Sequence, residues 1–105
     1  MDKIFQLARL CDCYGALLTA HQRQIVAQYV DENCSLAEIA EREGISRQGV
    51  RDTLRRAEKQ LEAYEQALGL ADKIQRHRRQ IEKLTKQNPN LATEIESLQE
   101  IWNDL

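Results

Sequence analysis

The sequence contains very little proline and glycine, and this scarcity already limits the fold. Only 1 Pro and 4 Gly occur among 105 residues. An all-β sandwich or barrel needs many short strands joined by frequent turns, so the composition argues against both. We therefore expect an all-α fold. The length suits one small domain with room for an appendage and only a modest core.

Long apolar runs and targeting signals are also missing. No stretch of about 18 apolar residues occurs, as a membrane-spanning helix would require. The opening residues Met1 to Ile4 lack the basic and then apolar build of a signal peptide. We expect a cytoplasmic protein with no membrane insertion.

The three cysteines form neither a disulfide framework nor a zinc-binding pattern. Cys11, Cys13 and Cys34 are odd in number and lack CxxC spacing. Only His21 and His77 are available as nitrogen ligands, so we expect reduced thiols and no metal or cofactor. The sequence also lacks a Gly-rich phosphate loop, an HExxH motif and a nucleophile elbow, so we expect no enzymatic activity.

Charge is low in total but strongly segregated along the chain. The formal net charge is −2, which argues against a nonspecific nucleic-acid binder. Residues 46–60 nevertheless sum to +3 and residues 73–86 to +5, whereas residues 87–105 sum to −4. Two basic segments therefore lie in an acidic background, where they could make local contacts.

Apolar residues spaced by three and four predict a series of helices. The first is expected over residues 2–14. Thr19 and Gln22 have the spacing of a capping box and should open a second helix. Ser35 and Glu38 repeat that spacing before a short helix of about two turns.

The central segment has the spacing of a helix-turn-helix motif. Gly44 can take a positive φ in the turn, and Ser46 can cap a new helix that begins at Arg47. The shared core of the two helices is expected to contain Ile39, Ile45, Val50 and Leu54. The opposite side of the second helix is then presented to solvent.

That presented side carries the candidate nucleic-acid-binding residues. Guanidinium and amide groups near the helix N-terminus suit guanine and adenine edges in a major groove, and their neighbours could hold phosphates. The predicted contact residues are Ser46, Arg47, Gln48, Arg51, Arg55 and Arg56. The alternatives are a solvated helix face or a protein-binding scaffold. Gly49, inside this helix, either permits close backbone approach or marks a relaxed requirement.

The last third of the chain predicts a helical extension, residues 71–105, that follows a bend at 67–70. Two apolar stripes are expected to form a hairpin: Ile74, His77, Ile81 and Leu84, and then Leu91, Ile95, Leu98, Trp102 and Leu105. Opposite charges favour antiparallel pairing of its arms, or else the second stripe pairs two chains in a homodimer. A secondary basic cluster, open to phosphate contact or to pairing with the acidic arm, contains Lys73, Arg76, Arg78, Arg79 and Lys83.

Several blocks of residues 1–70 resemble the YlxM family of bacterial proteins. They are Tyr14-Gly15-Ala16-Leu17-Leu18-Thr19 with Gln22, Ser35-Leu36-Ala37-Glu38-Ile39-Ala40, Ser46-Arg47-Gln48-Gly49-Val50-Arg51-Asp52, Tyr64-Glu65 and Leu68-Gly69-Leu70. The resemblance implies a helix-turn-helix domain similar to region 4 of sigma factors. It also implies a gene beside the GTPase of the signal recognition particle and a regulatory part in that pathway. Family members more usually have Ala where this chain has Gly49.

Together these observations predict a regulatory protein whose domain, residues 1–70, binds DNA or RNA. The resemblance adds the signal recognition particle, through its GTPase or its RNA, as the expected partner. Two alternatives remain open at this point. One is a DNA-binding transcription regulator, and the other is a protein-interaction module that docks on the GTPase.

Overall fold

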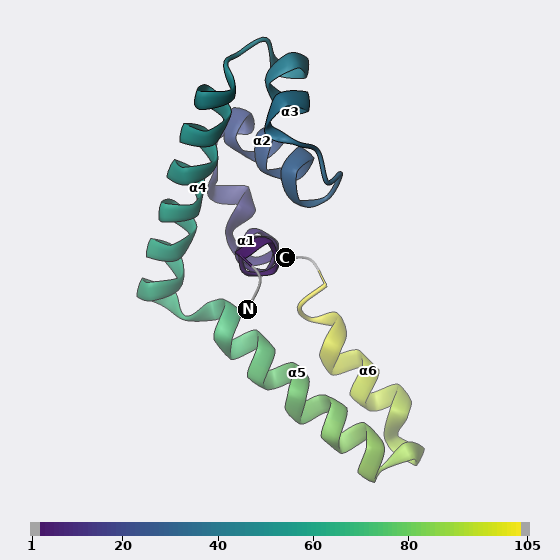
Figure 1. The fold of residues 1–105 in the computed structure, drawn as a ribbon. Helices are drawn as coiled ribbons and strands as arrows, with labels where there is room; N and C mark the ends of the chain where they lie inside the picture. Colours follow the sequence, from purple (N-terminus) through teal and green to yellow (C-terminus); the bar gives the residue numbers. More distant parts are fainter. Residues whose placement is uncertain (1–2, 104–105) are drawn as a thin grey trace. The chain divides into compact units, whose positions relative to one another are not determined.

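The computed structural model describes residues 3–103, which fold into helices joined by short connections (Figure 1). The α-helices are α1 (Lys3–Tyr14), α2 (Ala20–Val30), α3 (Leu36–Glu43), α4 (Arg47–Leu68), α5 (Leu70–Gln87) and α6 (Ala92–Glu100). Short 3-10 turns occupy Gly15–Leu17 and Pro89–Leu91. Residues 3–103 contain no strand, so the expected all-α fold is confirmed. The chain divides into two units, one ending at Leu68 and one beginning at Gly69.

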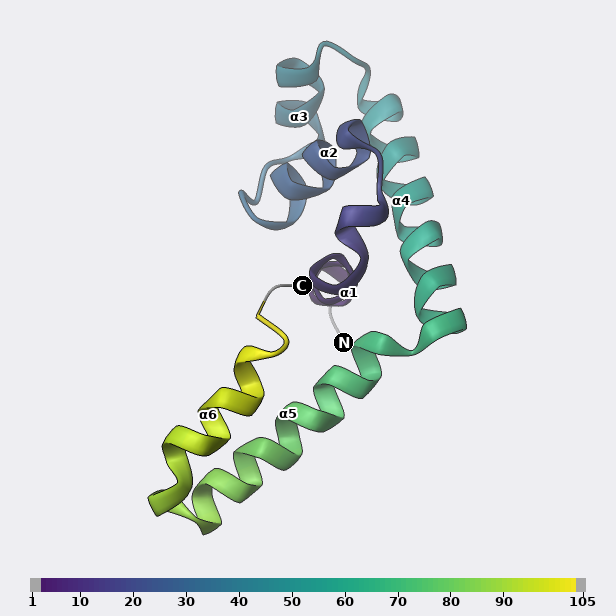
Figure 2. The ribbon, with the colours of Figure 1, turned by 180° about the vertical axis from the view of Figure 1, so that it is seen from behind.

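In the first unit, the long helix α4 supports α1, α2 and α3, which all pack against it (Figure 2). Val50 of α4 is fully buried and meets Ile39 of α3 and Ile25 of α2 in one hydrophobic cluster. Ile45 and Leu54 are partly buried and pack against this cluster. The predicted core of the helix-turn-helix motif is therefore confirmed.

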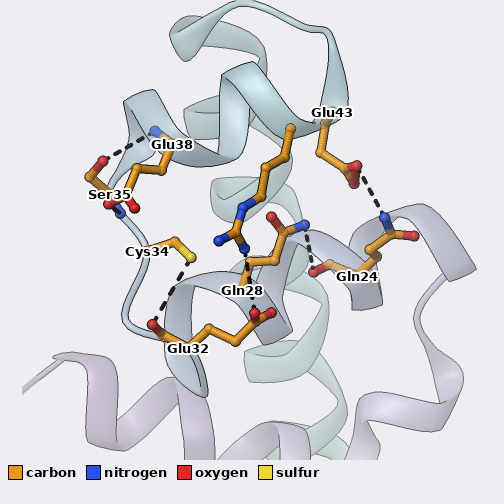
Figure 3. A network of polar contacts seen from close by, with 8 residues as sticks. Gln24, Gln28, Glu32, Cys34, Ser35, Glu38 and Glu43 are labelled. Atoms are coloured by element: carbon orange, nitrogen blue, oxygen red, sulfur yellow. Dashed lines mark hydrogen bonds and ion pairs between the residues drawn. The ribbon is translucent and has the colours of Figure 1, made fainter.

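Two capping boxes begin the helices α2 and α3. The Thr19 hydroxyl accepts from the Gln22 backbone N–H at 3.1 Å, and the Gln22 side chain accepts from the Thr19 N–H at 3.1 Å. Ser35 and Glu38 make the same exchange at 3.1 and 3.0 Å (Figure 3). Both predictions are confirmed, because each box satisfies amide groups that a helix start leaves without partners.

The turn between α3 and α4 depends on a left-handed glycine. Gly44 has φ +67° and ψ 32°, a conformation that costs a residue with a Cβ atom about 1–2 kcal/mol. Two residues later, the Ser46 hydroxyl accepts from the Gly49 N–H at 2.9 Å and caps α4. The predicted turn glycine and N-cap are both confirmed.

Polar side chains connect α2 with α3 on one side of the first unit (Figure 3). Gln24 Nε2 donates to Glu43 Oε2 at 3.0 Å. Gln28 is buried, and its Nε2 donates to the backbone carbonyl of Gln24 at 3.3 Å. Arg42 and Glu32 form an exposed ion pair at 3.4 Å. The Gln24–Glu43 bond joins α3 to α2, and the Arg42–Glu32 pair joins α3 to the loop after α2, whereas the Gln28 bond lies within α2.

The second unit is a hairpin in which α6 packs against α5. The expected bend lies at Gly69, whose φ is +62°, and the 3-10 turn at Pro89–Leu91 reverses the chain. Trp102 Nε1 donates to His77 Nδ1 at 3.1 Å, and their rings meet edge to face with centroids 5.7 Å apart. This contact ties the end of the hairpin to the middle of α5.

The second apolar stripe is only partly buried among the described residues of the hairpin. The helix α6 ends at Glu100. Ile95 is buried, but Leu91 and Leu98 remain 42% and 44% exposed, and Leu105 lies outside the described residues. A single facing helix covers only a narrow strip of its neighbour, so residues at the edges of the stripe stay in contact with solvent.

Charge pairing between the two arms of the hairpin is also absent from the described residues. The ion pairs found there join Asp72 to Arg76 at 3.0 Å and Glu82 to Lys86 at 3.8 Å, both within α5. Lys83 lies far around α5 from the buried Ile81, about 160° by helix geometry. It therefore points away from α6 and cannot reach its carboxylates.

Candidate nucleic-acid interface

Three arginines form a row along the first half of α4. Arg47, Arg51 and Arg55 are spaced by four residues, so they lie on one side of the helix, and all three are exposed. Val50 and Ala57, on the other side, are fully buried. We call Arg47, Arg51 and Arg55 the arginine row. The core holds the helix in place while the guanidinium groups face solvent.

Gln48 lies beside the arginine row and already makes hydrogen bonds within the helix. Its Nε2 donates to Asp52 Oδ1 at 2.9 Å, and its Oε1 accepts from Arg51 Nη1 at 3.4 Å. Exposed pairs of this kind stabilise a helix by only about 0.2–0.5 kcal/mol. A base edge could therefore replace them at little cost. Asp52, by contrast, places a negative charge beside the row.

The other predicted contact residues, Ser46 and Arg56, differ in position. The oxygen of Ser46 is used as the N-cap acceptor, while its hydroxyl proton can still be donated to a phosphate at the helix start. Arg56 is exposed but lies about 140° around α4 from Arg51. It is therefore not part of the arginine row, although it adjoins Arg55 in sequence.

Gly49 does not face the arginine row. A Cβ atom at this position would lie 3.2 Å from Ser46 Oγ and 3.7 Å from Ile45 Cδ1. The missing side chain thus leaves space for the preceding turn of the same protein. The close approach at Gly49 is therefore intramolecular.

A groove of about 300 Å³ opens beside the arginine row and was not expected from the sequence. Arg51, Arg55, Lys3 and Glu58 contribute its charged lining, with Lys3 and Glu58 3.8 Å apart. Its apolar lining consists of Ile4, Leu7, Tyr29, Leu36 and Leu54. These residues come from all four helices of the first unit, so no local sequence signal could have identified the groove.

The secondary basic cluster does not form one continuous surface on the hairpin. All five of its members are exposed. Arg76, Arg79 and Lys83 lie on the side of α5 opposite the buried residues. Arg78 instead lines a separate polar groove of about 630 Å³ between α5 and α6. Lys73 lies one turn before Arg76, and Arg76 is already engaged by Asp72.

The described residues offer no site for a metal ion. No group of three or more His, Cys, Asp or Glu side chains converges within residues 3–103. Burial, together with the nearby charges of Asp12 and Asp31, raises the pKa of the Cys11 thiol to about 11. This thiol stays protonated at neutral pH and is neither a nucleophile nor a ready ligand. None of the helices over these residues is long and apolar enough to span a membrane.

Comparison with known proteins agrees with the helix-turn-helix motif. A family described as "Putative helix-turn-helix protein, YlxM / p13 like" matches residues 1–101. A UPF0122 protein of Clostridium perfringens strain SM101 is 39% identical over 111 residues, which cover 98% of this chain and 99% of that protein. A UPF0122 protein of Caldanaerobacter subterraneus is 49% identical over 83 residues, covering 79% and 71%. The chain therefore belongs to the UPF0122 family of YlxM / p13-like proteins.

Proposed function

We propose that the protein is a non-enzymatic regulator that binds nucleic acid through the first half of α4. One observation carries this proposal: the exposed arginine row lies on the second helix of a helix-turn-helix motif whose other side is buried. In such motifs the second helix enters the major groove and presents its N-terminal residues to base edges. The groups that face outward here are therefore those that recognition requires.

Each predicted contact has a role suited to its chemistry. Arg47 and Arg51 would donate paired hydrogen bonds to guanine, and Gln48 would exchange its bond with Asp52 for an adenine edge. Arg55 would bind the phosphate backbone, as would Ser46 at the helix start. Arg56 lies on the flank of α4 and would contribute at most one peripheral phosphate contact.

The biological setting follows from the family resemblance. We propose that the protein acts in the cytoplasm as a regulatory component of the signal recognition particle pathway, with DNA or RNA as the ligand. The secondary basic cluster on α5 would supply further phosphate contacts to a long RNA. Retention of duplex DNA in place of RNA would instead favour a transcription regulator.

Fluorescence anisotropy with labelled RNA and labelled duplex DNA tests this proposal. Arg51→Glu should weaken binding by at least about fivefold, because a base contact is worth about 1–3 kcal/mol. Arg23→Glu is the matched control, since it changes the net charge equally at an exposed site on α2. About four basic contacts predict a log–log salt slope near −3 to −4. A flat salt response, or equal losses for both variants, would contradict the proposal.

A protein-interaction module is the second candidate, and the groove beside the arginine row favours it. Apolar walls next to Arg51 and Arg55 suit a partner segment that combines apolar and acidic side chains. The GTPase of the signal recognition particle is the partner implied by the resemblance. Loss of GTPase binding in Arg51→Glu, with neither RNA nor DNA bound by the unaltered protein, would favour this candidate.

A further inference from the structure

The hairpin of α5 and α6 leaves three leucines uncovered. Leu84 is 44% exposed, and Leu91 and Leu98 are exposed to a similar extent. The buried apolar side chains among residues 69–103 are Ala71, Ile74, Ile81 and Ile95. Units below about 40 residues usually need a metal, a disulfide or an oligomeric partner to be stable. A covering surface would therefore stabilise this hairpin.

Two of the three leucines, Leu84 and Leu98, share one flank of the hairpin. The opposite flank holds the polar groove, to which α5 contributes Glu82 and α6 contributes Glu96. At about 100° per residue, Leu84 lies about 160° around α5 from Glu82, and Leu98 lies about 160° around α6 from Glu96. Because the groove uses one flank of both helices, Leu84 and Leu98 lie on the other flank, and the exposed Leu91 lies in the turn that joins the two helices. We call Leu84, Leu91 and Leu98 the leucine face.

The two arms carry opposite charges that they do not use on each other. Residues 73–86 have a net charge of +5. The carboxylates of α6, Glu94, Glu96 and Glu100, have no ion-pair partner among the described residues. Glu96 and Glu100 line the polar groove on the opposite flank, whereas Glu94 lies about 40° around α6 from Leu98. The leucine face is therefore bordered by Lys83 on the basic arm and by Glu94 on the acidic arm.

We propose that the leucine face binds the same face of a second copy of this chain, forming a dimer. A two-fold axis parallel to the helices would lay α5 of one copy antiparallel to α6 of the other, so that basic and acidic arms meet. An axis across the helices would instead place α5 against α5, where like charges repel. The charge pattern selects the first arrangement, a closed four-helix bundle.

This arrangement specifies a contact at the rim of the interface. The bond between His77 and Trp102 sets the relative height of the two helices. Counting from it along both helices, Lys83 and Glu94 lie within about one turn of each other in height, on the outer edges of the leucine face. The two-fold axis therefore brings Lys83 of one copy to Glu94 of the other.

Sedimentation of the full chain tests the apolar part of the interface. The unaltered protein should be a dimer at micromolar concentration, and Leu84→Glu should raise the dimer dissociation constant by at least about tenfold. Leu17→Glu is the control, because Leu17 is 58% exposed but lies in the first unit. A monomeric unaltered protein, or equal effects of the two substitutions, would overturn the proposal.

A charge exchange tests the arrangement with two exposed residues of the hairpin. Lys83→Glu and Glu94→Lys should each weaken the dimer several-fold, and the double variant should recover it to within about twofold. Circular dichroism should show unchanged helicity in all three variants. Failure of the double variant to recover dimerisation, or a species larger than a dimer, would exclude this bundle.

Discussion

The first unit buries side chains from all of its helices, whereas the hairpin that follows Gly69 keeps much of its apolar surface in solvent. Leu10, Ile25, Ile39 and Leu61 are completely or almost completely buried in the first unit. In the hairpin, Ile101 is 65% exposed in addition to the leucine face. Both units have helices with the same three- and four-residue apolar spacing, so the difference lies in the number of neighbouring helices.

The helix N-termini are also better satisfied in the first unit than in the hairpin. In the first unit, side chains cap α2, α3 and α4. In the hairpin, neither α5 nor α6 has a side-chain cap. A unit with a complete core and capped helices is stable as a single chain, whereas one with neither feature gains more from a partner.

The largest expected effect comes from a matched pair of core truncations. Ile39→Ala in the first unit should lower the free energy of unfolding by about 3–5 kcal/mol, because a fully buried side chain leaves a cavity. Ile95→Ala in the hairpin should cost about 2 kcal/mol or less, since its surroundings are partly open. Urea unfolding followed by circular dichroism measures both. Equal costs would show that the two cores are equally complete.

Two glycines of the helix-turn-helix motif should respond in opposite directions. Gly44→Ala should destabilise the protein by about 1–2 kcal/mol, because its left-handed backbone strains any residue with a Cβ atom. Gly49→Ala should stabilise it by up to about 1 kcal/mol, since alanine is the better helix former. This gain requires Ser46 Oγ to move by a few tenths of an ångström. Thermal unfolding measures both variants. A Gly49→Ala variant that is less stable than the unaltered protein would show that the Ser46 hydroxyl cannot move.

Removing the cap of α4 should lower the free energy of unfolding by less than Gly44→Ala does. Ser46→Ala leaves the Gly49 N–H without its partner and should cost about 1 kcal/mol. Because Ser46 is also a proposed phosphate contact, Ser46→Thr provides the control, which retains the hydroxyl. Denaturant unfolding of both variants separates the capping role. Equal stability of Ser46→Ala and the unaltered protein would mean that water replaces the cap.

The smallest effect is a pH dependence confined to the capping box of α3. The backbone N–H and hydroxyl of Ser35 lower the pKa of Glu38 below its usual 4.5. The resulting stability is present above about pH 4.5 and is lost as the pH falls through the lowered value in the folded protein. Glu38→Gln keeps an acceptor oxygen, so it should reduce this acid sensitivity. Identical pH profiles from pH-dependent thermal unfolding would contradict the assignment.

The site could be predicted only in part, for reasons that particular residues make clear. Arg47, Arg51 and Arg55 share a side because their spacing equals about one helical turn, and this can be counted from the sequence. Arg56, which the sequence analysis named with Arg55 as a possible phosphate contact, lies about 100° around α4 from Arg55. The hydrogen bonds of Gln48 and the space used at Gly49 depend on side-chain positions, which spacing does not supply.

The amino-acid order by itself determined the helices, the two capping boxes and the left-handed turn at Gly44, because these features depend on interactions across three or four residues. Tertiary structure alone decided which apolar stripes are covered. It also assembled a groove from Ile4, Tyr29 and Leu54, which are distant in the chain. The physical reason is that burial depends on how many elements meet at one place, and periodicity describes only one element at a time.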